Sequence, residues 1–293
     1  MLNRRELIKN VVLLAAMTKF AAPKGSKECR PVKKFKIGAC DWSIGKDSDP
    51  GAFQVARAIG LDGIMVNMGS LENDLHLRQP DLQEVYLKES ARTGISISSL
   101  ALGELNNTPF KSDPRTEQWV SDSIDVAHQL HVPVILLAFF SSNDLRGDQA
   151  GKNEVIRRLR KLAPKAEQLG VTLGIESYLN AAEHLEIIEK VGSNQVKAYV
   201  DFRNMADAGY DVLREVKQLG KDNICELHIK ENGFLLGEGS IDWRRIFETL
   251  YQMNYYGDGW MQIEWSMPNM ADTVDSYRHN LRFLQELFAK QPA

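Results

Sequence analysis

Cysteine is scarce in this sequence of 293 residues, and its spacing is irregular. The three cysteines, Cys29, Cys40 and Cys225, form no C-x-x-C pair. Their number and spacing exclude a disulfide framework, and an odd count leaves at least one thiol free. Cys40 and Cys225 lie in apolar runs and are predicted to be small core residues, whereas Cys29 lies in a segment that we interpret below as a linker.

The sequence also lacks an excess of either charge. Its 36 Lys and Arg residues nearly balance 39 Asp and Glu residues, which gives a formal net charge of -3. A protein this close to neutral has little attraction for the phosphates of nucleic acids, so we expect no nucleic-acid partner. A hydrophobic content of 43% is enough for a large core, and the length suits one α/β barrel or two small domains.

The N-terminal segment has the pattern of an export signal rather than of a folded domain. Arg4 and Arg5 precede a short apolar stretch over residues 11–17, and small residues and a Pro-Lys-Gly-Ser linker follow. The stretch is too short to span a bilayer, and the paired arginines resemble a twin-arginine signal. We therefore predict a signal peptide and linker over residues 1–30, a periplasmic or exported protein, and no stable membrane anchor. The alternatives are an amphipathic helix of the mature domain and a cytoplasmic location.

From Phe35 onward, short apolar runs alternate with amphipathic stretches. The apolar runs are typical of parallel strands that are covered on both faces, and the spacing of the other stretches is helical. The predicted strands cover residues 35–43, 63–67, 95–102, 132–140, 171–176, 196–201, 224–230 and 260–265. The predicted helices cover residues 50–60, 81–94, 114–130, 152–170, 181–191, 210–219, 243–255 and 271–290.

Eight such units match the size of a closed (β/α)8 TIM barrel, which we predict as a single domain over residues 35–291. An open doubly wound sheet is the second choice, but no strand is followed by G-x-G-x-x-G or G-x-x-x-x-G-K-[ST], so a nucleotide-binding version lacks support. Pro164 is expected to kink the fourth helix or to shift its start. Glycines are expected to end several helices, at positions 60, 94, 170, 192 and 220.

Four consecutive predicted strands each carry a polar residue toward the carboxyl end: Glu176, Asp201, His228 and Glu264. In a barrel these ends meet at one mouth. Three buried carboxylates there would repel one another and raise their pKa values unless they bind a cation. Oxygen donors with one imidazole suit Mn²⁺, Mg²⁺, Co²⁺ or Zn²⁺, and the carboxylate majority favours a six-coordinate ion with open positions. The sequence therefore predicts one divalent metal ion bound by these four residues.

Taken singly, each of the four has a structural alternative. Glu176 fits a surface glutamate, Asp201 a helix N-cap or turn, His228 a buried core histidine, and Glu264 the partner of a nearby arginine. Their coincidence at one level of four neighbouring strands favours the metal site.

From Phe35 to the C-terminus the chain resembles the sugar phosphate isomerase/epimerase family of xylose-isomerase-like barrels, which includes the ketose 3-epimerases. The matching stretches are Gly174-Ile175-Glu176, Tyr199-Val200-Asp201, Leu227-His228-Ile229-Lys230, Ile263-Glu264 and the turn over residues 237–243. The resemblance implies that the four ligands bind one divalent ion, with Mn²⁺ as the leading expectation. It also implies that Glu176 and Glu264 act as the acid/base pair, and it allows a homodimer.

The expected chemistry is proton transfer beside a carbonyl. The metal polarises the carbonyl and stabilises an enediolate, while one glutamate removes the alpha proton and the other returns one. We therefore expect a sugar isomerase or epimerase with a small sugar or sugar derivative as substrate. A lyase or dehydratase acting on a keto-sugar, keto-glycoside or keto-inositol starts with the same step and is the alternative. A non-catalytic sugar-binding barrel is a further alternative.

Four more residues are candidates for contacting the substrate. Lys230 shares its side of the strand with the predicted histidine ligand and can bind an oxyanion or hydroxyl, or else pair with Glu231 at the rim. Asn204 stands where the ketose 3-epimerases have a histidine, so it can bind a hydroxyl but cannot titrate near neutral pH. Glu104 follows the third strand and Trp42 lies at the end of the first, so both can line the mouth, and Trp42 can stack on a sugar face. For both, ordinary packing or a loop position is the alternative.

Overall fold

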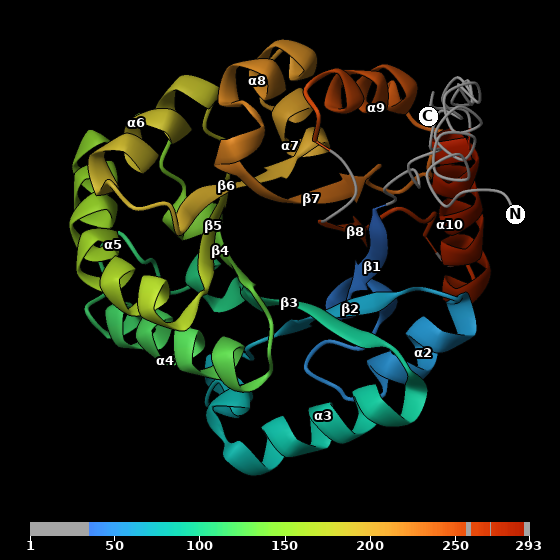
Figure 1. Ribbon diagram of the computed structural model, residues 1–293, viewed down its shortest axis with the longest axis horizontal. Helices are drawn as coiled ribbons and strands as arrows, with labels where there is room; N and C mark the ends of the chain where they lie inside the picture. Colours follow the sequence, from blue (N-terminus) through green and yellow to red (C-terminus); the bar gives the residue numbers. More distant parts are fainter. Residues whose placement is uncertain (1–34, 256–258, 270, 290–293) are drawn as a thin grey trace, which may run out of the picture. The chain divides into compact units, whose positions relative to one another are not determined.

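Eight parallel strands close into a barrel in chain order, and helices surround it (Figure 1). The computed structural model describes residues 35–255, 259–269 and 271–289. The strands are β1 (Lys36–Cys40), β2 (Gly63–Asn67), β3 (Ser96–Leu102), β4 (Val134–Phe139), β5 (Thr172–Ser177), β6 (Val196–Asp201), β7 (Ile224–Lys230) and β8 (Trp260–Glu264). Parallel pairing of β1 with β8 closes the ring, with Gly38 opposite Gln262. The predicted TIM barrel is therefore confirmed.

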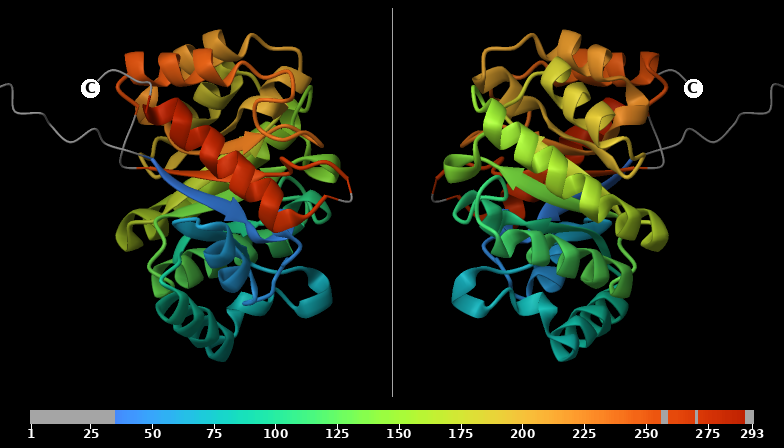
Figure 2. Two further views of the ribbon diagram at one scale, coloured as in Figure 1. Left: turned by 90° about the vertical axis from the view of Figure 1, so that its right-hand side faces the viewer. Right: turned by 90° about the vertical axis from the view of Figure 1, so that its left-hand side faces the viewer.

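The helices lie outside the strands in both side views (Figure 2). They are α2 (Ala52–Ile59), α3 (Pro80–Thr93), α4 (Arg115–Gln129), α5 (Gln149–Leu169), α6 (Ala181–Val191), α7 (Phe202–Asp207), α8 (Val212–Leu219), α9 (Trp243–Gln252) and α10 (Thr273–Ala289). No helix in these described ranges is long and apolar enough to cross a bilayer.

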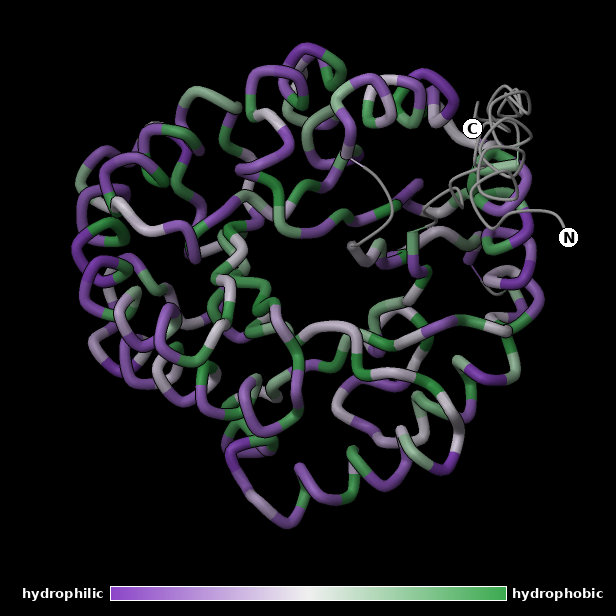
Figure 3. Tube along the Cα trace, viewed as in Figure 1, coloured by the Kyte–Doolittle hydropathy of each residue, from purple (hydrophilic) through white to green (hydrophobic). Residues whose placement is uncertain are grey.

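The pattern of hydrophobic residues explains this arrangement. Hydrophobic residues predominate along the central strands, whereas the outer helices alternate between hydrophilic and hydrophobic residues (Figure 3). Strand β4 is buried along its whole length, as expected for a parallel strand with helices outside it. Gly60, Gly94, Gly170 and Gly192 end their helices in the left-handed conformation, which glycine adopts without steric cost. Gly220 ends α8 in a different conformation, with ψ at 152°.

The expected elements differ from the structure in several bounds and in one missed helix. The predicted first strand ends early, at Cys40, because the chain turns there into a 3-10 helix, η1 (Asp41–Ile44). The short helix α7 was missed, since it begins directly at the end of β6. Helix α5 starts at Gln149, capped by Asp148, and continues through Pro164, so the proline does not set its start. The predicted signal peptide and linker over residues 1–30, with Cys29, lie outside the described residues.

Candidate metal centre

Four neighbouring strands bring Glu176, Asp201, His228 and Glu264 to one end of the barrel. Each residue offers one ligand atom, and these four atoms lie within 4.8 Å of one another. All four residues are buried, with between 0% and 6% of their surface exposed. The strand register aligns them, because Asp201 lies opposite His228 and Lys230 lies opposite Glu264. The carboxyl ends of the strands therefore present three carboxylates and one imidazole to a shared space.

His228 lies at the centre of this group and turns Nδ1 toward the carboxylates. Nδ1 is 3.0 Å from Oε1 of Glu176, 3.7 Å from Oε2 of Glu264 and 3.9 Å from Oδ2 of Asp201. The ring of Tyr199 packs edge-on against the imidazole, with centroids 4.7 Å apart. The imidazole is thus held with one nitrogen facing three acidic side chains, unlike a histidine that merely fills core space.

Asp201 divides its two carboxylate oxygens between structure and site. Oδ1 accepts a hydrogen bond of 2.9 Å from the backbone N–H of Asn204, so Asp201 is the N-cap of α7. Oδ2 is buried and has no hydrogen-bond donor in the described part of the chain. A buried oxygen without a partner is costly unless a cation or water reaches it. The N-cap alternative and the metal-ligand prediction therefore concern different oxygens of the same residue.

Lys230 points into the same site rather than toward Glu231. Its Nζ is 3.0 Å from Oε2 of Glu264 and 3.6 Å from Oδ2 of Asp201. Glu231 instead accepts a hydrogen bond of 2.8 Å from the indole N–H of Trp243. The rim salt bridge considered for Lys230 is therefore wrong, and the lysine brings a positive charge to the carboxylates.

These contacts shift the pKa values of the group. Burial alone would lower the pKa of His228, but the charges of Glu176 and Glu264 outweigh it and raise the pKa to about 9. Burial raises the pKa of Asp201 to about 6, against the opposing charge of Lys230. Burial opposes ionisation of Glu264 as well, yet the charges of His228 and Lys230 keep its pKa below the usual value. Without a metal ion, a proton on His228 supplies part of the missing positive charge.

The donor set fits a divalent cation. Carboxylate oxygens and one imidazole nitrogen are the ligands that Mn²⁺, Mg²⁺, Co²⁺ and Zn²⁺ accept in proteins. Asp201 supplies a buried oxygen that no donor satisfies, and His228 turns a nitrogen toward it. The residues present are therefore suitable to hold one such ion.

Asn204 and Trp42 each bind a predicted acid/base glutamate. Asn204 is buried, and its side-chain N–H donates to Oε1 of Glu176 over 3.2 Å. The indole N–H of Trp42 donates to Oε1 of Glu264 over 2.8 Å. Both residues therefore lie at the site, where they orient the carboxylates in addition to any contact with a ligand.

Glu104 is less directly connected to the site. It lies in the 3-10 helix η4 (Gly103–Asn106), is 7% exposed, and accepts a hydrogen bond from the hydroxyl of Thr108. Within the described ranges, no hydrogen bond or ion pair joins it to the four candidate ligands. Its assignment to substrate binding stays a prediction.

Cys40 is a site residue that the sequence prediction placed only in the core. Its Sγ lies 3.4 Å from Nε2 of His228, on the side of the ring away from the carboxylates, and both residues are fully buried. Burial raises the pKa of the Cys40 thiol, and the nearby charges of Glu264 and Glu176 raise it further. The neutral sulfur can therefore accept a hydrogen bond from the Nε2–H group while Nδ1 faces the carboxylates. The signal in the sequence was its position at the end of β1, level with the other strand ends.

A second polar layer below the centre was also missed. Glu226 and Gln262 precede His228 and Glu264 by two residues, so they lie on the same side of their strands, one layer deeper. The Gln262 amide donates to Oε1 of Glu226 over 3.2 Å and to the hydroxyl of Ser98 over 2.9 Å. Burial raises the pKa of Glu226 to about 7. Gly38 makes room for this layer, because a Cβ there would overlap with the Gln262 amide.

Comparison with known proteins agrees with this fold. The family model described as xylose isomerase-like TIM barrel matches residues 53–287. The chain is 31% identical to D-psicose 3-epimerase of Enterocloster bolteae over 133 residues, which cover 42% of this chain and 43% of that protein. It is 25% identical to 2-epi-5-epi-valiolone 7-phosphate 2-epimerase of Actinoplanes sp. over 222 residues, covering 73% and 82%.

A solved structure supports the fold. The apo structure of 3-keto-D-glucoside 4-epimerase from Escherichia coli superposes with a TM-score of 0.70 at 18% identity, covering 86% of this chain and all of that one. At this identity the likeness concerns the fold alone. The first of the two relatives by sequence is matched over less than half of its length, whereas the second is matched over most of it.

Proposed function

The chain belongs to the xylose isomerase-like TIM barrel family, and we propose that it is a divalent-metal-dependent sugar isomerase or epimerase. The observation that carries this proposal is the buried convergence of Glu176, Asp201, His228 and Glu264 at the catalytic end of the barrel. Relatives by sequence are named as epimerases of sugars or sugar-like compounds, which supports the same class of reaction here.

The proposed metal site uses one atom from each of the four residues. Among the ions that this donor set accepts, we favour Mn²⁺, because three carboxylates and one imidazole combine hard oxygen ligands with one borderline nitrogen. When bound, the ion would polarise a substrate carbonyl and stabilise negative charge that develops on its oxygen.

The side chains around the site would divide the remaining work. We assign Glu176 and Glu264 to proton transfer, one removing a proton from the carbon beside the carbonyl and the other returning a proton to the substrate. Asn204 holds Glu176, and Trp42 and Lys230 hold Glu264. These bonds orient both carboxylates.

The experiment combines metal analysis with isotope exchange. Purified protein is loaded with Mn²⁺, its metal content is measured, and D-fructose and other ketoses are incubated with it in D2O and followed by NMR. The proposal expects one ion per chain, deuterium at the exchanged carbon and an epimer or isomer as product. Loss of a leaving group would instead indicate the lyase, since elimination begins with the same proton abstraction.

Matched variants test the two glutamates. Glu176→Gln and Glu264→Gln should each lower the exchange rate by about 100-fold or more, the usual contribution of general acid/base catalysis. Glu189→Gln is the control, because Glu189 is exposed on α6 away from the strand ends. Absence of bound metal, or unchanged exchange in Glu264→Gln, contradicts the proposal.

We also propose that residues 1–30 direct export through the twin-arginine route. The paired Arg4 and Arg5 ahead of a short apolar stretch support this. Replacing both arginines by lysine should leave the protein in the cytoplasmic fraction; unchanged secretion would contradict the proposal.

A further inference from the structure

The charged groups around the barrel mouth restrict the chemistry of the substrate. The loops that follow the strands form this mouth, and here they are called the mouth loops: residues 41–51, 68–79, 103–114, 140–148, 178–180, 202–211, 231–242 and 265–272, of which 270 lies outside the described residues. Proteins bind phosphate groups with free cations or with free N–H groups at helix N-termini. Both cations and helix N-termini occur at this mouth.

The Lys and Arg side chains of the mouth loops and of the adjoining strand end are each paired with a carboxylate. In the described part of the chain, the pairs and their closest N–O distances are Lys46–Asp49 at 3.0 Å, Arg78–Asp122 at 3.0 Å, Lys111–Asp148 at 3.0 Å, Arg146–Asp144 at 2.6 Å, Arg203–Asp207 at 2.8 Å and Lys230–Glu264 at 3.0 Å. Such pairs are weak when exposed and can open. A cation that opened would, however, leave its carboxylate beside the bound phosphate.

Two of the arginine pairs are further constrained. Arg146 binds both oxygens of Asp144 and also lies over the ring of Tyr178, 4.5 Å from its centroid. Arg203 binds Asp207 four residues later on α7 and has a second acid, Glu231, at 4.0 Å. The two guanidinium groups are thus already paired with acidic side chains of the mouth loops.

Five helix N-termini at the mouth are likewise filled by aspartates of the chain, whereas α2, α3 and α4 have no side-chain cap and α6 is capped by Asn180. Each of these carboxylates accepts a backbone N–H in the first turn of its helix: Asp148 at α5, Asp201 at α7, Asp211 at α8, Asp242 at α9 and Asp272 at α10. A carboxylate in this position satisfies the N–H groups that a phosphate would use, and it repels an approaching anion. The usual phosphate site of TIM barrels, near the last two strands, is therefore occupied by acidic caps.

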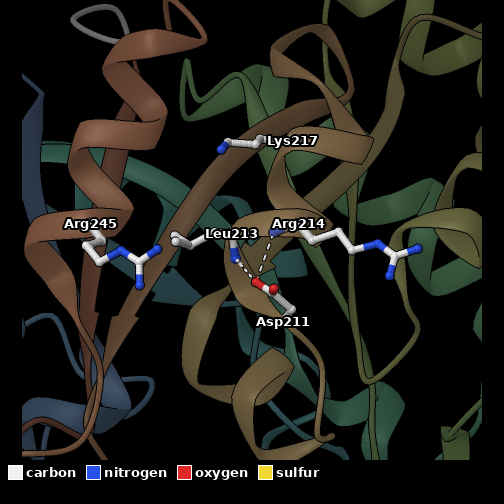
Figure 4. A pocket seen from close by; sticks show the side chains of 5 residues that line it. All are labelled: Asp211, Leu213, Arg214, Lys217 and Arg245. Atoms are coloured by element: carbon white, nitrogen blue, oxygen red, sulfur yellow. Dashed lines mark hydrogen bonds between the residues drawn. The ribbon is translucent and has the colours of Figure 1, made fainter.

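A groove with basic residues does exist; it lies on outer helices and includes Asp211 of the mouth loops. Arg214 and Lys217 on α8 and Arg245 on α9 line it together with Asp211 (Figure 4). In this view the guanidinium group of Arg245 points toward Asp211, whereas that of Arg214 points away from it. They do not converge on one anion, and Asp211 adds an acid between them.

Uncharged surface is available at the mouth instead. Phe234 and Trp265 follow β7 and β8 and are 52% and 45% exposed, which is unusual for such large apolar side chains in this protein. A backbone hydrogen bond of 3.2 Å from Gly233 to the carbonyl of Trp265 joins their two loops. Trp265 directly follows the candidate ligand Glu264 and has a positive φ of 46°. Flat aromatic faces suit the C–H faces of a neutral sugar ring.

From these observations we infer that the metal centre takes an uncharged sugar or glycoside and discriminates against a sugar phosphate. This inference rests on the proposed function, and it separates the chain from relatives whose names include a phosphate substrate, such as the valiolone 7-phosphate epimerase. Like charges brought close together repel each other, so a terminal phosphate would weaken binding at a mouth rimmed with carboxylates.

The test compares matched substrates on the metal-loaded protein. D-Ribulose is compared with D-ribulose 5-phosphate, and D-fructose with D-fructose 6-phosphate, for kcat/KM of exchange in D2O. We expect the phosphate to lower kcat/KM by about tenfold or more, and we expect this penalty to shrink as NaCl is added, because salt screens exposed charges. A phosphate ester that is preferred over its parent sugar overturns the inference while leaving the proposed function intact.

A binding measurement decides the inference without turnover. Calorimetry compares D-arabinitol with D-arabinitol 5-phosphate, and it also tests inorganic phosphate alone. Tighter binding of the phosphate ester, or saturable binding of inorganic phosphate that competes with D-arabinitol, overturns the inference. Weaker binding of the ester supports it, even if neither ketose pair reacts, an outcome that would count against the proposed function only. Equal binding of the ester and D-arabinitol overturns it.

Two charge variants supply the matched pair for these assays. Asp207→Asn frees Arg203 at the mouth, so it should raise the relative affinity for the phosphate ester and leave the neutral polyol unchanged. Asp275→Asn frees Arg278 on α10 and should change neither affinity. If ester affinity rose equally in both variants, the effect would come from net charge alone. That result would contradict the proposed role of the mouth loops.

Discussion

The pKa of His228 makes the metal-free protein less stable as the pH rises. Its folded-state pKa is about 9, against 6.5 for an unperturbed histidine. A histidine whose pKa is raised by folding stabilises fully below the unfolded pKa and loses this effect as the pH rises through the folded pKa. Between pH 6.5 and 8.5 the loss is about 2 kcal/mol of unfolding free energy. Urea unfolding with a chelator present at both pH values measures it.

Bound metal should abolish this dependence. A metal ligand must give up its proton, so in the loaded protein His228 is neutral, as it also is in the unfolded chain above pH 6.5. The unfolding free energy of the Mn²⁺-loaded protein should then be flat over the same range after correction for metal affinity. His228→Gln, unfolded in the same way without metal, should also lack the decrease. An equal decrease in wild type and His228→Gln would show that other groups cause it and would refute the reasoning.

Substitutions at three positions test the residues around the centre. Trp42→Phe keeps an aromatic ring but removes the N–H that Glu264 accepts, so we expect kcat to fall by about tenfold with unchanged metal content by elemental analysis. Cys40→Val removes the hydrogen-bond acceptor beside Nε2 of His228 and should weaken Mn²⁺ binding by about 10- to 100-fold. Cys40→Ser keeps an acceptor and should largely retain the affinity. Equal calorimetric affinities in the two variants would refute a role for this acceptor. Trp265→Ala should lower kcat/KM for a bulky phenyl keto-glucoside by about tenfold and leave kcat/KM for a free ketose unchanged. A shift from dimer to monomer by light scattering would instead identify Trp265 as a subunit contact.

The sequence was sufficient to predict the barrel, because the two periods of hydrophobic residues differ so clearly. Strand β6 and helix α6 have the predicted bounds. The errors lie where the chain changes direction without a hydrophobic signal. Helix α7 has only six residues, so its apolar positions do not extend over enough turns to distinguish it from a loop.

The position of the four candidate ligands at one mouth could be predicted, because the carboxyl ends of all strands meet there whatever the details of packing. The direction of individual side chains could not be predicted in the same way. Lys230 was equally compatible with Glu231 and with the site, and only the packing of Trp243 against Glu231 decides between them. The contact of Cys40 with His228 joins residues 188 positions apart, on strands that the sequence does not align in register.

The charges at the mouth explain both the stability prediction and the choice of ion. The carboxylates of Glu176, Asp201 and Glu264 carry three negative charges, and Lys230 offsets one of them, which leaves a charge of about -2 when His228 is neutral. A proton on His228 removes half of that excess, which is why its pKa is high without metal. A divalent ion removes all of it and releases the proton, whereas a monovalent ion would leave a negative site. The same accounting explains why a phosphate ester is a poor ligand here: no positive charge is left over at the centre, and the rim cations are already paired.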